Sequence, residues 1–69
     1  MYRLQFIRHG KDGFVRNDLR EFPTFNWAEK ALKDELQNEQ YRYEANGMKP
    51  PPIKKTRIGE LEIRIIKTN

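Results

Sequence analysis

The sequence contains no cysteine and no serine, and it has a single histidine, His9. Without cysteine the chain has neither disulfides nor thiolate ligands for zinc, so packing alone must hold its core. The lack of serine excludes a serine hydrolase triad. One histidine and the absence of an Asp-x-Asp-x-Asp loop leave no recognisable metal site. The sequence therefore predicts a protein that is not an enzyme and needs no cofactor.

Long apolar runs are also missing. No stretch approaches the roughly 20 apolar residues that a membrane-spanning helix needs, and residues 1–7 alternate in polarity instead of forming the apolar block of a signal peptide. Small secreted domains usually carry disulfides, which this chain cannot form. We therefore expect residues 1–69 to form a single small domain with a cytoplasmic location and no membrane partner.

The charge of the chain is uneven along its length. The net charge is +4, but residues 26–46 hold three basic and five acidic residues, a net charge of −2, so the remainder carries +6. Such an asymmetry indicates an anionic partner for the basic remainder.

The first 17 residues have the pattern of a β-hairpin. Residues 2–9 alternate, so one side of a strand would carry Tyr2, Leu4, Phe6 and Arg8, and the other Arg3, Gln5, Ile7 and His9. The segment Gly10-Lys11-Asp12-Gly13 has the composition of a tight turn, after which residues 14–17 can return as a second strand.

A helix is predicted between Asn26 and Asn46. Asn26 followed by Glu29 matches a capping box, and glycine at position 47 is a common helix end because it accepts a left-handed backbone. Apolar residues recur with the period of a helix from the residue before this segment onward. They are Phe25, Ala28, Leu32, Leu36 and Tyr43.

The last third of the chain is extended. Three prolines, residues 50–52, cannot continue a helix, and residues 53–67 alternate as strands do. Gly59 interrupts this run, as a tight turn between two strands or as a bulge in one.

The predicted fold is therefore an α+β domain of two layers, with the order β-β-α-β or β-β-α-β-β. One amphipathic helix would pack on a three- or four-stranded, mainly antiparallel sheet and leave the other face of the sheet uncovered. The predicted core consists of Tyr2, Leu4, Phe6, Phe14, Leu32, Leu36, Leu61, Ile63 and Ile65, with Phe25 and Ala28 at its edge.

One short motif points to a known chemistry. A strand that ends in Arg8-His9-Gly10 resembles the start of the histidine phosphatase and phosphoglycerate mutase superfamily, in which the histidine accepts a phosphoryl group and the arginine helps to hold it. That chemistry needs a second histidine and a doubly wound chain more than twice as long as this one. We therefore interpret Arg8 and His9 as polar residues at the end of a strand.

Ten residues are predicted to contact a partner. Basic residues on the strands could reach phosphates or acidic side chains from the uncovered sheet face and its rim, while tryptophan, tyrosine and arginine are the residues that most often anchor protein interfaces. The predicted contact residues are Arg3, Arg8, Lys11, Arg16, Trp27, Tyr41, Lys54, Lys55, Arg57 and Arg64. The alternatives are that the basic residues only solubilise the protein and that Trp27 folds over the edge of the core.

Two functions fit this pattern. The first is a small binding protein, similar in style to phage or mobile-element inhibitors, that blocks a larger protein, for example one that handles nucleic acid. The second is sequence-independent nucleic-acid binding by the basic strands, although such binders usually add exposed aromatic side chains for base stacking. A homodimer formed through the uncovered sheet is compatible with either function.

Overall fold

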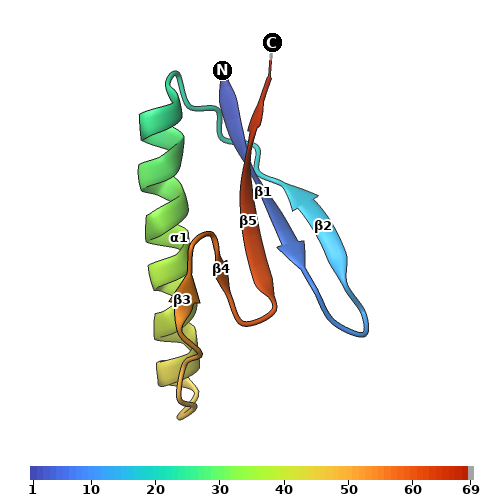
Figure 1. Ribbon diagram of the computed structural model, residues 1–69, viewed down its shortest axis with the longest axis vertical. Helices are drawn as coiled ribbons and strands as arrows, with labels where there is room; N and C mark the ends of the chain where they lie inside the picture. Colours follow the sequence, from blue (N-terminus) through green and yellow to red (C-terminus); the bar gives the residue numbers. More distant parts are fainter. Residues whose placement is uncertain (69) are drawn as a thin grey trace.

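Five strands and one helix form the fold of residues 1–68, the part of the chain that the computed structural model describes. The elements are β1 (Tyr2–Arg8), β2 (Phe14–Asn17), α1 (Phe25–Ala45), β3 (Ile53–Lys54), β4 (Arg57–Ile58) and β5 (Leu61–Lys67). The strands form one sheet in the order β2-β1-β5-β4-β3, and all neighbours are antiparallel. The helix packs on β5, β1 and β4, with β2 at the opposite edge of the sheet (Figure 1). The α+β prediction is confirmed, with one strand more than expected.

The centre of the sheet joins the two ends of the sequence. Strand β1 pairs with β5 along its whole length, from Tyr2 opposite Lys67 to Arg8 opposite Leu61. Because side chains alternate between the two faces of a strand, this register puts Leu4 and Ile63 on the side of the helix. The pattern of apolar residues thus selects the register, since a shift of one strand by one residue would turn its apolar side chains to the opposite face of the sheet.

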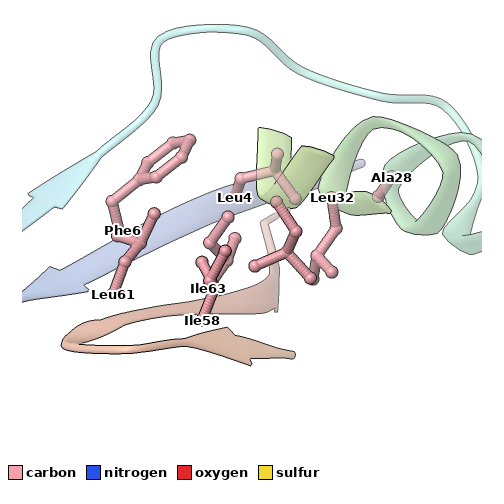
Figure 2. Packing of buried hydrophobic residues seen from close by; sticks show 8 residues of the cluster. Leu4, Phe6, Ala28, Leu32, Ile58, Leu61 and Ile63 are labelled. Carbon is pink, nitrogen blue, oxygen red and sulfur yellow. The ribbon is translucent and has the colours of Figure 1, made fainter. Parts of the chain in front are cut away.

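The core lies between α1 and the sheet and contains eight buried apolar residues, seven of which are labelled in Figure 2. They are Leu4, Phe6, Ala28, Leu32, Leu36, Ile58, Leu61 and Ile63. Tyr2 and Ile65 are partly buried and pack against this cluster.

Three predictions about the core are wrong, and one of them concerns Ala28, which was expected at the edge of the core but is fully buried. Phe14 was expected inside, but its side chain is 52% exposed because β2 lies beyond the reach of the helix. Ile58 was not expected in the core, yet it is fully buried, since the short strand β4 returns beneath α1.

The helix begins earlier than predicted. Thr24, not Asn26, is the N-cap, and its Oγ1 accepts a hydrogen bond from the backbone N–H of Trp27 at 3.2 Å. A threonine hydroxyl can satisfy such a donor, and because Asn26 then lies inside the helix, the capping box from Asn26 to Glu29 does not form. The predicted end is confirmed: Asn46 is the C-cap and Gly47 has a φ of +71°.

The segment after the prolines forms three strands, and Gly59 lies in a turn. Ile58 pairs with Leu61, so that Gly59 and Glu60 form a two-residue connection in which Gly59 has a φ of +54°. The bulge alternative is therefore wrong. A second two-residue connection joins Lys54 to Arg57, and there Lys55 takes a φ of 56°, which is uncommon for a residue other than glycine.

Candidate binding surfaces

The face of the sheet opposite the helix carries no second layer within residues 1–68. The pairing registers place on this face the side chains of alternate residues from every strand. They are Arg3, Gln5, Ile7, Val15, Asn17, Lys54, Arg57, Glu62, Arg64 and Ile66, with His9 beyond the end of β1. The predicted open face is thus present, with apolar side chains among the charged ones.

Ion pairs neutralise much of the charge on this open face. Arg3 Nη2 lies 2.9 Å from Glu21 Oε1. Glu62 accepts from His9 Nε2 at 2.7 Å and from Arg64 Nε at 3.0 Å. These two bonds, that from His9 foremost, hold the pKa of Glu62 below its usual value. The centre of the open face is therefore a mixed surface and not a continuous basic one.

Basic side chains gather instead at the β3–β4 hairpin. Lys54, Lys55 and Arg57 are exposed, and no carboxylate within residues 1–68 lies within ion-pair distance of any of them. Lys54 and Arg57 face each other across the hairpin. Arg57 Nε donates to the Gly59 carbonyl at 2.9 Å, which orients the guanidinium. The two side chains border a cavity of about 220 Å³ beside the prolines.

The outer face of α1 presents two large aromatic side chains. Trp27 is 65% exposed and Tyr41 is 57% exposed, so the alternative that Trp27 folds over the edge of the core is wrong. The two residues are 14 positions apart, which corresponds to about 21 Å along a helix axis. Lys30 and Asp34 lie between them, so this outer helix face combines aromatic groups with charges of both signs.

Arg8 and Arg16 lie on the helix side of the sheet, away from the open face. Arg8 Nη1 donates to Glu39 Oε2 at 2.9 Å, and Arg42 Nη1 donates to Glu39 Oε1 at 3.4 Å. The Glu39 side chain is only 7% exposed, and this pairing offsets part of the cost of burying its charge. The Arg16 guanidinium lies 4.4 Å from the centroid of the Phe6 ring, a distance typical of a cation–π contact.

These side chains border a groove between α1 and β2. Its volume is about 220 Å³, and we call it the arginine groove. It is lined by Phe6, Arg8, Phe14, Arg16, Glu39 and Arg42, among others. Glu39 and Arg42 were not among the predicted contact residues, although Glu39 falls on the buried stripe of the helix, three residues after Leu36.

The segment after β2 is held against α1 by Arg20. Arg20 Nε donates to Asp18 Oδ2 at 2.7 Å, and Arg20 Nη2 donates to Glu35 Oε1 at 2.9 Å. Burial by itself would raise the pKa of Asp18, but the hydrogen bonds from the Arg20 side chain and backbone outweigh it and lower that pKa. Arg20 thereby ties the connection to α1.

The ten predicted contact residues thus divide among separate surfaces. Arg3, Arg64, Lys54 and Arg57 lie on the open face, with Lys55 at the adjoining turn. Arg8 and Arg16 line the arginine groove, Lys11 is exposed in the β1–β2 loop, and Trp27 and Tyr41 are on the outer helix face. The expected convergence of the basic strand residues on one face is therefore only partial.

The described residues contain no group of three or more histidine, cysteine, aspartate or glutamate side chains that could hold a metal ion. Within residues 1–68, no helix is long and apolar enough to cross a membrane. Comparison of the chain with protein-family models, curated proteins and solved structures finds no match.

Proposed function

We propose that this chain is a non-enzymatic binding protein that docks on a larger protein through the outer face of α1. The observation that carries the proposal is the exposure of Trp27, whose side chain is 65% accessible. Tryptophan has the largest apolar surface of any side chain, and its burial against a partner often dominates the binding energy of an interface.

The fold makes little use of this indole. Trp27 donates its backbone N–H to the helix cap. The neighbouring helix residues that belong to the core cluster are Ala28 and Leu32, and the indole is not part of that cluster. Its neighbour Phe25 packs edge-on against Tyr2, with ring centroids 5.9 Å apart. An exposed tryptophan that the fold does not need supports a role in recognition.

The surroundings of Trp27 suit a protein surface of mixed polarity. A cavity of about 350 Å³ lies beside the indole and is lined by Asn26, Trp27 and Lys30. Asp34 and Tyr41 extend the outer helix face with an acidic and an aromatic group. The net charge of +4 would favour approach of the chain as a whole to an acidic partner.

Replacement of Trp27 by alanine tests this proposal. Loss of an interface anchor costs about 2 kcal/mol or more, which is a weakening of about 30-fold. The measurement is recovery of partner protein on the immobilised chain from nuclease-treated lysate, followed by titration with the purified partner. Trp27 is the only tryptophan of the chain, so when it is replaced by 5-hydroxytryptophan, which can be excited apart from the tryptophans of the partner, a blue shift on binding reports burial of the indole.

Met48→Ala is the matched control, since Met48 is also exposed and apolar but lies beyond the helix. Both variants should keep the circular dichroism spectrum and melting temperature of the parent protein. A partner that binds the parent and Trp27→Ala equally well would refute docking through the outer helix face.

Nucleic-acid binding is the second candidate function, and the β3–β4 hairpin favours it. Its three exposed cations lack carboxylate partners within residues 1–68, so all three are available to phosphates. Three phosphate contacts on a single strand give a log–log dependence of affinity on salt with a slope of about −2.

Reversal of the hairpin charges tests this second candidate. The variant Lys54→Glu, Lys55→Glu, Arg57→Glu should lose binding to a fluorescent single-stranded oligonucleotide in low salt, as measured by anisotropy. The control Lys11→Glu, Lys30→Glu, Lys33→Glu has the same net charge of −2 (from +4 by three reversals) and should retain most of the affinity. Equal loss in both variants would show that net charge alone drives the binding.

A further inference from the structure

The outer edge of β2 is an open edge of the sheet. Within residues 1–68, strand β2 has a single neighbour, β1, and the Asp18 N–H donates to the Leu4 carbonyl at 2.9 Å. In an antiparallel pair, residues that exchange hydrogen bonds alternate with residues that do not. The register from Gln5 opposite Asn17 onward therefore points the N–H and C=O groups of Val15 and Asn17 outward.

Exposed apolar side chains lie beside these outward-pointing N–H and C=O groups. Phe14 and Val15 are both more than half exposed, and Leu19, just beyond the strand, is 88% exposed. Proteins usually protect an exposed sheet edge with charge, proline or a covering segment. Here the edge has one charged residue, Arg16, and no proline within β2, so it is well suited to receive another strand.

Among the arginines beside this edge, Arg16 is the one that could bind an acidic side chain of a partner. Arg8 and Arg42 share the carboxylate of Glu39, and Arg20 binds Asp18 and Glu35. No carboxylate within residues 1–68 lies within ion-pair distance of Arg16. Arg16 lines the arginine groove, so a carboxylate on an added strand would meet it at the rim of that groove.

We propose that the edge of β2 binds an extended, acidic segment of a protein partner as a sixth strand. The backbone of the segment pairs with Val15 and Asn17, an apolar side chain packs against Val15 on the open face, and an aspartate or glutamate meets Arg16 on the helix side. This inference rests on the proposed function, in that the partner is a protein. A second copy of the chain is a poorer occupant, because its own β2 would bring another Arg16.

The probe is the peptide acetyl-(Glu-Val)4-amide, with acetyl-(Lys-Val)4-amide as the control of opposite charge. Titration into the ¹⁵N-labelled chain should shift the amide signals of Val15 and Asn17 and slow their hydrogen exchange. Neutralising Arg16 as Arg16→Gln should weaken the glutamate peptide by about fivefold, the loss of one partly exposed ion pair.

Val15→Pro removes the outward N–H, and a sheet edge tolerates proline at such a position. This variant should bind the glutamate peptide about tenfold more weakly, while Val15→Thr, which keeps the N–H, should bind it like the parent. Hydrogen exchange of Leu4 and Phe6 amides checks that the sheet is intact, and Arg16→Gln tests the site without a backbone change.

Equal binding of both peptides, or shifts that avoid β2, would overturn the proposal. So would a concentration-dependent dimer that Val15→Pro abolishes, since the occupant would then be a second copy. The two proposals fail separately: if the purified partner loses affinity with Trp27→Ala but not with Val15→Pro, the helix face binds it and the sixth strand does not form.

Discussion

Replacing Ile58 by alanine is expected to lower the free energy of unfolding by about 2–5 kcal/mol. Ile58 is fully buried in the cluster between α1 and the sheet, where truncation removes apolar contacts and leaves a cavity that the rigid neighbours cannot refill. A domain of 69 residues has a total stability of only about 3–10 kcal/mol. The substitution should therefore remove a large share of the total stability.

Ile53→Ala is the matched control for this experiment. Ile53 faces Ile58 across the β3–β4 hairpin, so the two variants lose the same atoms from paired positions. Ile53 is 39% exposed, and its truncation should cost about 1 kcal/mol or less. Urea denaturation followed by circular dichroism measures both, and equal losses would place Ile58 outside the core.

Replacing Gly13 by alanine should have the second large effect, a loss of about 2–3 kcal/mol of stability. A Cβ at this position would lie 2.5 Å from the carbonyl oxygen of Arg8, a contact that only a shift of the backbone can relieve. Arg8 pairs with Phe14, the first residue of β2, so the shift would disturb the closed end of the β1–β2 hairpin. The expected result is a lower urea midpoint, with faster hydrogen exchange across β2.

Gly10→Ala tests the same loop without the backbone clash. There the three atoms nearest to the added Cβ belong to the Glu60 carboxylate, the first of them at 2.9 Å, and a flexible side chain can move away at little cost. We expect the urea midpoint of this variant to stay near that of the parent. If Gly10→Ala and Gly13→Ala were equally destabilised, the loop as a whole and not the approach to Arg8 would be the constraint.

Because the candidate surfaces are separate, substitutions in one surface should not change binding through another. The outer helix face, the β3–β4 hairpin and the β2 edge belong to different elements, and their exposed residues contribute little to the core. Substitutions more than about 10 Å apart that share no partner usually have additive effects on stability. Loss of binding in one variant can therefore be assigned to one surface, provided that its melting temperature is unchanged.

Local patterns in the sequence were enough to predict the strands at both ends, the helix and the two-layer arrangement. The alternation of Leu4 and Phe6 with polar residues encodes a strand with one buried face, and the recurrence of Leu32 and Leu36 encodes a helix with one buried stripe. These signals are local, because each depends only on the spacing of neighbouring residues along the chain. Glycine at position 47 marked the helix end for the same reason.

Burial of individual residues depended on the tertiary structure. Phe14 and Ile58 are both apolar residues in short strands, yet Phe14 is half exposed and Ile58 fully buried. Their burial differs because α1 packs over β4 and does not reach β2. The position of the helix on the sheet depends on all the contacts between them. Sequence spacing alone does not contain that information.

The candidate surfaces, too, were determined partly by the sequence and partly by the tertiary structure. The sequence determined that basic residues would be abundant on the strands and that Trp27 would lie off the buried stripe of the helix. Only the folded chain decided which cations are neutralised, because Arg8 meets Glu39 and Arg3 meets Glu21 across 31 and 18 residues of sequence. Pairing over such separations is created by the fold, and it leaves the charge of Lys54, Lys55 and Arg57 concentrated at one hairpin.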